Sequence, residues 1–253
     1  FAQQTGQNLE YTAQDVPAEY FEACVSKFLS QGGRGLNCTV PLKELAWRRA
    51  DHCSERAQRA KAVNTLKREQ DGGLYGDNTD GEGLVRDLRV NLGLGLAGKR
   101  VLLLGAGGAS RGILQPLLDE FPDELVLANR TVAKGEQLAR EFAGLGVPVF
   151  ACGYVDLAEQ SFDLILNATA ASLHGEMPPL PSEVLAMDGA CYDLAYGTKP
   201  TAFVRWGQEH GAAVSADGLG MLVEQAAVAF WIWRGVRPDT GPVIRLLREE
   251  RGF

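Results

Sequence analysis

The residues best suited to chemistry are the glycines at positions 105, 107 and 108, which follow the apolar run 101–104. Such a run predicts a strand buried on both faces of a parallel sheet, and 109–118 reads as a helix that Pro116 could kink. A strand, a glycine turn and a helix N-terminus bind phosphate, because amide N–H groups and the helix dipole point at the anion. The pattern G-x-G-x-x-S predicts cofactor contacts from Gly105, Ala106, Gly107, Gly108, Ala109 and Ser110. An ordinary strand-to-helix turn is the alternative, since a single glycine motif is a weak signal.

The end of the next predicted strand, 124–128, indicates which dinucleotide would fit. In NAD-binding units this strand ends in an acid for the ribose 2′-hydroxyl, whereas an arginine in NADP-binding units can hold the 2′-phosphate. Here the sequence is Asn129-Arg130-Thr131, followed by Lys134, and it has no acid. Arg130 could be a solvated surface charge, but its place beside the expected ribose favours a ligand. We therefore predict NADP as the cofactor.

Composition limits the remaining possibilities. A chain of 253 residues is long enough for two domains, and its net charge of −7 argues against a nucleic-acid surface. The three histidines are scattered, which argues against a metal site, and we expect no metal. No apolar run is long enough for a membrane span and no signal peptide is present. The five cysteines (24, 38, 53, 152 and 191) have no metal-type spacing, so we expect reduced thiols and a cytoplasmic protein.

The supporting elements alternate between strand and helix from about residue 100 to 215, which predicts a doubly wound parallel sheet. Its predicted strands are 101–104, 124–128, 147–151, 163–166 and 190–194, with helices at 109–118, 132–142 and 201–209. Before it we expect a strand at 8–12, a helix through 21–29, a strand at 35–40, a helix at 46–60 and a hairpin at 62–76. Thr79 and Glu82 fit a capping box, and the tail predicts helices at 221–233 and 242–251.

Six separated blocks of this sequence resemble the shikimate dehydrogenase family. They are residues 37–44 (NCTVPLKE), 62–66 (AVNTL), 76–81 (GDNTDG), the glycine loop, 129–131 (NRT) and 217–225 (DGLGMLVEQ). The blocks occur in the family's order and cover nearly the whole chain, so together they are far more specific than one motif. The resemblance implies NADPH-dependent reduction of 3-dehydroshikimate to shikimate, the fourth step of the shikimate pathway.

The same resemblance implies an α/β fold with two domains. It implies a Rossmann-like, doubly wound NADP-binding domain at 82–217. A second α/β domain would bind the substrate and be formed from both chain ends, 1–81 and 218–253, with a cleft between the two.

Residue roles also follow from the resemblance, which puts the family's catalytic pair on Lys43 and Asp80. Hydride delivery to a carbonyl leaves an alkoxide that must be protonated, so the site needs a positioned acid. An ammonium group can donate to that oxygen, and a nearby carboxylate can orient it and hold a substrate hydroxyl. On their own, Lys43 could be a solvated charge and Asp80 part of a helix start. The resemblance further implies substrate contacts from Thr39, Asn64, Tyr196 and Gln225, and nicotinamide contacts from Ala168, Leu194, Gly218 and Met221.

Each substrate residue also has a structural interpretation. Thr39 or Asn64 could close a turn, and Tyr196 could be a packing aromatic. Gln225 has support from the pattern, because it falls within an apolar helix face and a buried amide needs hydrogen-bond partners. A backbone partner would satisfy it equally. The apolar face comprises Met221, Leu222, Val228, Ala229 and Ile232.

One departure from the family concerns the N-terminal end. The family's first strand and its Ser-x-Ser turn, which binds the substrate carboxylate, do not occur in this chain, which starts at Phe1. Losing hydrogen bonds to a charged group costs about 1.5–3 kcal/mol each. We expect a fragment of a longer protein rather than a defective substrate domain, because no initiator methionine is present. As it stands, the chain is expected to bind NADP and to reduce 3-dehydroshikimate poorly or not at all.

Three alternative functions stay open from the sequence. A quinate/shikimate dehydrogenase shares the fold and the catalytic pair, although Arg130 argues against NAD as its cofactor. A non-catalytic NADP-binding protein is a different class, against which Lys43, Asp80 and Gln225 argue together. An inactive scaffold of a multienzyme assembly is the third. For partners we expect a small-molecule substrate (shikimate or 3-dehydroshikimate), no nucleic acid and no membrane, in a monomer or homodimer.

Overall fold

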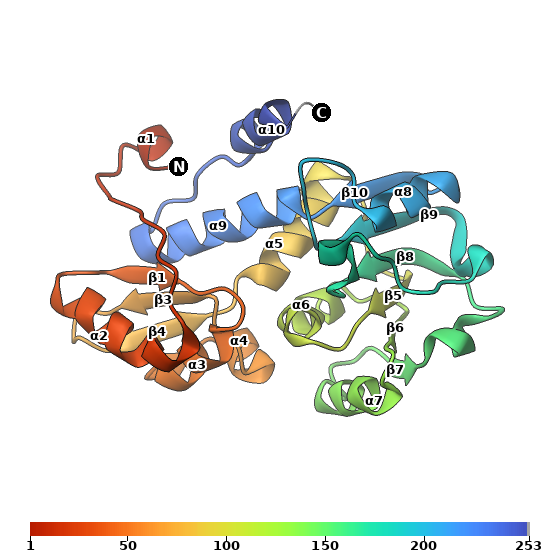
Figure 1. The fold of residues 1–253 in the computed structure, drawn as a ribbon, viewed down its shortest axis with the longest axis horizontal. Coiled ribbons are helices and arrows are strands. Elements are labelled where there is room, and N and C mark those ends of the chain that lie inside the picture. The colour runs from red at the N-terminus through yellow and green to blue at the C-terminus, as the bar shows by residue number, and fades with distance from the viewer. Residues whose placement is uncertain (252–253) are drawn as a thin grey trace.

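Two separate sheets form the framework of the protein (Figure 1). The computed structural model describes residues 1–251, apart from the side chain of Leu173. The smaller sheet has four strands in the order β1-β3-β4-β2, and β3 pairs antiparallel with both β1 and β4. The larger sheet has six strands in the order β10-β9-β8-β5-β6-β7, all parallel. No helix in the described part of the chain is long and apolar enough to cross a membrane.

The helices and strands follow the chain in this order. The first half contains α1 (Ala2–Thr5), α2 (Phe21–Ser30), β1 (Gly35–Asn37), α3 (Lys43–Arg49), β2 (His52–Cys53), α4 (Glu55–Ala60), β3 (Thr65–Arg68), β4 (Leu74–Asp77), α5 (Asp80–Arg86), the π-helical turn η2 (Asp87–Asn91), β5 (Arg100–Leu104), α6 (Gly108–Leu118) and β6 (Glu124–Ala128). The second half contains α7 (Val132–Glu141), β7 (Val149–Cys152), β8 (Phe162–Asn167), β9 (Leu185–Asp193), α8 (Ala202–Glu209), β10 (Val214–Asp217), α9 (Leu219–Arg234) and α10 (Gly241–Glu250).

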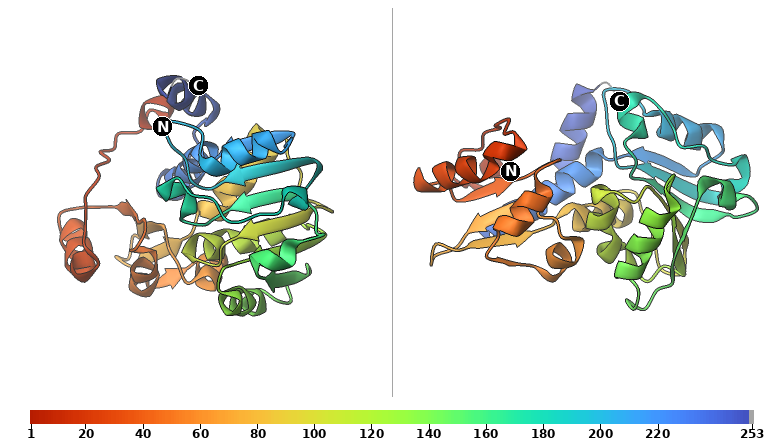
Figure 2. Two further views of the ribbon diagram at one scale, coloured as in Figure 1. Left: turned by 45° about the vertical axis from the view of Figure 1, so that its right-hand side comes forward. Right: turned by 60° about the horizontal axis from the view of Figure 1, so that its bottom comes forward.

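The parallel sheet confirms the predicted doubly wound architecture. From β5 the chain builds outward through β6 and β7, then returns to the other side of β5 and continues through β8, β9 and β10. Helices cover both faces of this sheet (Figure 2). The direction in which the sheet grows changes between β5 and β8, and such folds bind dinucleotides at this point, beyond the carboxyl ends of the strands. The glycine loop follows β5 and therefore lies at this edge.

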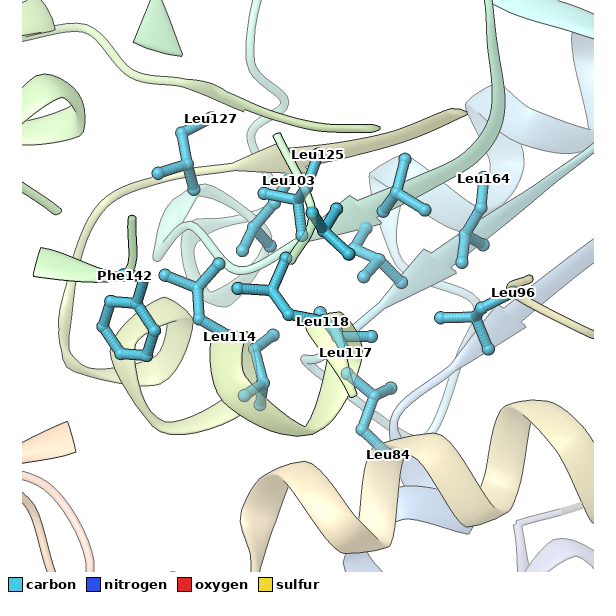
Figure 3. Packing of buried hydrophobic residues seen from close by; sticks show 14 of the residues in the cluster. Leu84, Leu96, Leu103, Leu114, Leu117, Leu118, Leu125, Leu127, Phe142 and Leu164 are labelled. Carbon is cyan, nitrogen blue, oxygen red and sulfur yellow. The ribbon is translucent and has the colours of Figure 1, made fainter. Parts of the chain in front are cut away.

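The part of the molecule built on the six-stranded sheet is called the larger lobe, and the part built on the four-stranded sheet the smaller lobe. Most side chains in the main apolar cluster of the larger lobe are leucines (Figure 3). Leu103 on β5 and Leu125 on β6 face Leu114 and Leu117 on α6, and all four side chains are inaccessible to water. Burying a leucine side chain contributes about 1.5–3 kcal/mol. This packing fixes the N-terminus of α6 against the end of β5, which is the geometry that a phosphate site requires.

Helices α5 and α9 run between the two sheets and pack tightly on each other (Figures 1 and 2). Gly83 permits this approach, because a Cβ atom there would lie only 2.6 Å from the backbone nitrogen of Gln225. Asp80 is the first residue of α5 and Gln225 lies on α9. The close approach therefore sets the separation between two predicted site residues.

Three predictions for the N-terminal half are wrong. Residues 8–12 have no strand pairing in the structure. The predicted helix 46–60 is divided into α3 and α4, because Ala50 is extended and β2 pairs with β4. Thr79 does occupy the N-cap of α5 but makes no capping hydrogen bond. The Glu82 carboxylate forms ion pairs with Arg56 and Arg237 instead of closing a capping box.

The buried thiols give a first testable result. All five cysteines are unpaired, and burial raises the pKa of Cys191 to about 12 and that of Cys38 to about 11. Because the thiolate is the reactive form, both should resist alkylation at pH 8 in the native protein and react after unfolding. Mass spectrometry of iodoacetamide-treated protein, with and without denaturant, measures this. Rapid native labelling of Cys191 would contradict the observed packing of β9.

Candidate active site

Lys43 and Asp80 meet although 37 positions separate them in the sequence. The Lys43 Nζ atom donates to Asp80 Oδ2 at 2.5 Å, and both side chains are largely buried. Lys43 begins α3, where its carbonyl oxygen accepts from the backbone nitrogen of Val63. An ammonium group has three donors, and within residues 1–251 Asp80 is the only hydrogen-bond partner of this one. Two N–H groups therefore stay free for a ligand.

Asn64 ties this pair to the smaller sheet. Its Oδ1 atom accepts from the backbone nitrogen of Thr79 at 3.0 Å and from the hydroxyl of Thr65 at 2.8 Å. A backbone nitrogen can only donate, so the amide orientation is fixed and Nδ2 must face Asp80. Asn64 Nδ2 donates to Asp80 Oδ1 at 2.8 Å. Each oxygen of the Asp80 carboxylate thus receives one hydrogen bond, from Lys43 and from Asn64.

Gln225 reaches the same cluster from α9. Its Oε1 atom lies 3.3 Å from Asn64 Nδ2 and 3.3 Å from the hydroxyl of Thr79. Its Nε2 atom donates to the carbonyl of Leu222 at 2.9 Å. The amide of Gln225 therefore has the backbone partner that a purely structural role would require. The second Nε2 hydrogen has no partner within residues 1–251. Four predicted residues therefore form one hydrogen-bonded chain, from Lys43 through Asp80 and Asn64 to Gln225.

Thr79 is a site residue that the sequence analysis missed, because its position suggested a helix cap. Its side chain is fully buried and joins Asn64 to Gln225. An N-cap threonine without a capping bond is detectable only once the fold is known.

Thr39 and Tyr196 lie outside this hydrogen-bonded cluster. Thr39 is exposed, and its carbonyl oxygen accepts from the backbone nitrogen of Leu42 in the turn before α3. Tyr196 is 44 % exposed in the loop after β9, with the guanidinium of Arg251 5.1 Å from its ring centre. In the described chain, no side-chain hydrogen bond connects either residue to Lys43 or Asp80.

The glycine loop has the geometry of a phosphate cradle. Gly105 has a φ of 100°, which favours glycine, and a Cβ atom there would lie 3.3 Å from the carbonyl oxygen of Ala168. Gly107, Gly108 and Ala109 are exposed at the N-terminus of α6, and open space lies where Cβ atoms of the two glycines would be. The Ser110 side chain is buried and donates to the Gly105 carbonyl at 2.8 Å. Its hydroxyl therefore stabilises the conformation of the loop.

Two exposed cations, Arg130 and Lys134, follow the end of β6. Arg130, Thr131 and Lys134 are exposed, and within residues 1–251 neither Arg130 nor Lys134 forms an ion pair. Asn129 shapes this turn, since its side chain donates to the Thr131 carbonyl at 2.8 Å. An unpaired arginine beside the expected ribose is available to an anion.

The residues predicted at the nicotinamide follow three neighbouring strands. Ala168 comes directly after β8, Leu194 after β9 and Gly218 after β10, and Met221 lies in the first turn of α9. The backbone nitrogen of Leu194 donates to Asn167, and that of Gly218 donates to Ala195. These residues share the carboxyl edge of the sheet with the glycine loop.

A buried carboxylate, Asp193, supports the loop that contains Leu194 and Tyr196. It accepts from the hydroxyls of Ser172 at 2.5 Å and Thr201 at 2.6 Å, and from the backbone nitrogen of Ala195 at 3.1 Å. Burial raises the pKa of this carboxyl group, while the donors oppose the shift. The sequence gives no signal for this role, because the donors come from separate segments.

The fold and the site define a class: a nicotinamide-dinucleotide oxidoreductase with a lysine–carboxylate pair on a second α/β unit. Among the described residues, no cluster of histidine, cysteine or acidic side chains is arranged to hold a metal ion. Family models match three parts of the chain. They describe a shikimate dehydrogenase substrate binding domain (residues 1–66), a shikimate / quinate 5-dehydrogenase (89–174) and a shikimate 5′-dehydrogenase C-terminal domain (218–248).

Full-length comparisons agree with these models. The NADP(+) shikimate dehydrogenase of Methylococcus capsulatus is 66% identical over 99% of this chain and 90% of the relative. The solved structure of an Ael1 enzyme from Pseudomonas putida has a TM-score of 0.91 and 50% identity, covering 97% of this chain and 90% of that one. Shikimate 5-dehydrogenase from Thermus thermophilus, in complex with NADP(H) and shikimate, has a TM-score of 0.85 and 33% identity over 98% of this chain and 90% of that one. The chain belongs to the shikimate dehydrogenase family.

Proposed function

We propose that this protein is an NADP-dependent shikimate dehydrogenase in which Lys43 and Asp80 are the catalytic pair. It reduces 3-dehydroshikimate to shikimate, reversibly, in the shikimate pathway. The observation that carries the residue assignment is the hydrogen-bonded chain from Lys43 through Asp80 and Asn64 to Gln225, four residues from separate segments of the sequence. A non-catalytic NADP-binding protein would have no need for this arrangement.

The residues of the larger lobe fit NADP. Exposed glycine amides at the N-terminus of α6 suit the pyrophosphate. Arg130 can form paired, charge-assisted hydrogen bonds with the 2′-phosphate, and Lys134 adds a second positive charge. Asn129 and Thr131 shape the turn around the ribose. The nicotinamide would contact Ala168, Leu194, Gly218 and Met221.

The chemistry assigned to the protein is the transfer of one proton. Bound NADPH supplies the hydride that adds to the carbonyl carbon. Lys43 donates the proton to the oxygen, so that the carbonyl becomes a hydroxyl and the lysine becomes a neutral amine. Asp80 holds Nζ in place, because its carboxylate accepts a hydrogen bond from the ammonium group at 2.5 Å. Solvent then restores the proton to Lys43, whose side chain is 22% exposed.

Substrate binding is assigned to the polar groups around this pair. Asn64 and the free Nε2 hydrogen of Gln225 would bind ring hydroxyls, with Thr39 and Tyr196 closing the site from the α3 turn and the β9 loop. The two functional units are assigned to 1–81 with 218–253 for the substrate, and to 82–217 for NADP. We assign the protein to the cytoplasm, where unpaired cysteines stay reduced.

Four assays test the function: shikimate and quinate, each with NADP and with NAD, followed by nicotinamide absorbance. We expect the highest kcat/KM for shikimate with NADP. Preference for quinate with NAD would identify a quinate/shikimate dehydrogenase. Tight NADP binding without turnover, both in this chain and in the chain preceded by the family's first strand and serine turn, would favour the non-catalytic class. The same assays on the chain preceded by the family's first strand and serine turn test the expectation for the N-terminal end. Variants are then compared in the form with the higher turnover.

A further inference from the structure

A buried carboxylate that the mechanism does not use lies where three elements of the protein meet. Asp87 is the first residue of the π-helical turn η2, directly after α5, and it is 1% exposed. Its Oδ2 atom accepts from the hydroxyl of Tyr192 on β9 at 2.7 Å, and its Oδ1 atom accepts from Asn91 at 2.8 Å. In residues 1–251 no cation lies within ion-pair distance of it. Burying a carboxylate that only hydrogen bonds compensate costs free energy of folding. The π-helical turn is a second unusual feature, because such turns are frequent at functional sites.

The third element is the first turn of α9. A Cβ atom on Gly220 would lie 2.0 Å from Asp87 Oδ1, so only glycine lets the helix pass this close. The first amides of a helix lack partners within it. One of them, the backbone nitrogen of Met221, donates to the hydroxyl of Tyr192 at 3.3 Å. The Tyr192 hydroxyl thus accepts from α9 and donates to Asp87, linking β9, α9 and η2 through one oxygen atom.

Residues assigned to the active site lie a short distance along each of these elements. Asp80 precedes Asp87 by two helical turns, and Gln225 follows Met221 by one turn. Leu194 lies two residues beyond Tyr192, directly after β9, and it packs against the apolar cluster that contains Tyr192. A shift of α9 against β9 would therefore move the residues assigned to nicotinamide binding, Leu194 and Met221, relative to the Lys43–Asp80 pair.

We propose that Asp87 and Tyr192 are positioning residues for hydride transfer, which fix the first turn of α9 against α5 and β9. This inference rests on the proposed function. It assigns the pair no contact with substrate or cofactor. The pair holds Leu194 and Met221, and through them the nicotinamide, at the distance and angle from the substrate that the reaction needs. Small misplacements of reacting groups slow a reaction strongly.

The test is Tyr192→Phe, which keeps the ring in the core and removes only the hydroxyl. Ser215→Ala on β10 is the control, since it also deletes one hydroxyl, which is partly buried and donates to the Val204 carbonyl at 2.7 Å. For Tyr192→Phe we expect kcat to fall about 10-fold. The deuterium isotope effect with shikimate labelled at the oxidised carbon should increase. Affinity for adenosine 2′,5′-bisphosphate, which lacks the nicotinamide, should not change. Ser215→Ala should alter the melting temperature only.

A purely structural role makes a different prediction. If both variants lower the melting temperature and both keep the wild-type kcat and isotope effect, the inference is wrong. Absence of turnover in the unsubstituted protein, both as the present chain and preceded by the family's first strand and serine turn, would instead reject the proposed function, so the two failures are distinguishable.

A second variant, Asp87→Asn, keeps the shape and one acceptor oxygen, and it replaces Tyr192→Phe under the same criteria if the latter does not fold. When both fold, kcat of the double variant should be about equal to that of the slower single variant, because the effects of substitutions at residues that act as one unit are not additive. Multiplying effects would show that the two residues act separately and would overturn their assignment as one unit.

Discussion

Alanine in place of Lys43 is expected to lower kcat for shikimate oxidation by about 1,000-fold, within the range for loss of a general acid–base group. Affinity for NADP should stay within about twofold, because Lys43 belongs to α3, beside the smaller sheet, and the glycine loop belongs to the larger one. Steady-state kinetics and fluorescence titration with NADP measure the two quantities. Near-normal turnover would show that Lys43 is not the acid.

Two further variants separate proton transfer from charge. Lys67→Ala removes a partly buried lysine from β3 in the same lobe, where it forms no ion pair within residues 1–251, and should retain activity. Lys43→Arg keeps the positive charge beside Asp80, but a guanidinium does not deprotonate in the working pH range. If Lys43→Arg recovered most of the activity, Lys43 would act through its charge and not by donating a proton.

The parallel sheet could be predicted well because its signals are local. Each strand is a short apolar run, and each run is followed by turn residues and a helix. The predicted strand 124–128 and the helix after the glycine loop agree with β6 and α6 to within one residue. Binding of NADP could be predicted for the same reason, since Arg130 lies at a fixed place after β6.

The smaller lobe could be predicted less well because its elements depend on distant partners. Residues 8–12 alternate as a strand does, yet a strand requires a neighbour to pair with, and Tyr11 instead donates a hydrogen bond to Asn37. Ser54 does cap α4, by accepting from Ala57, but the charged residues on either side of β2 suit one long helix equally. The pairing of β2 with β4 decides between one long helix and two short ones, and this pairing is a tertiary contact.

The candidate site shows the same division. Lys43 and Asp80 are ordinary residues in their local context, and only the family resemblance singled them out. The structure brings them together through Asn64, whose fixed amide orientation depends on Thr79 and Thr65. No local pattern assigns Thr79, Asp87 or Tyr192 to the contacts they make, because their partners lie up to 146 positions away. Chemistry that depends on long-range contacts becomes visible only in the folded chain.

Cofactor choice is expected to change with Arg130. Arg130→Asp should raise the dissociation constant for NADP about 100-fold or more, because two charge-assisted hydrogen bonds to the 2′-phosphate are replaced by repulsion. The constant for NAD should change only a few-fold, since a carboxylate can accept from the ribose 2′-hydroxyl. Arg140→Asp, at an exposed position on α7 in the same lobe, is the control for the general effect of charge. Titration of both cofactors against each variant gives the four constants. If Arg130→Asp weakened NADP and NAD equally, or if Arg140→Asp produced the same selectivity, Arg130 would not be the 2′-phosphate ligand and discrimination would have to arise from another group, with Lys134 the next to test.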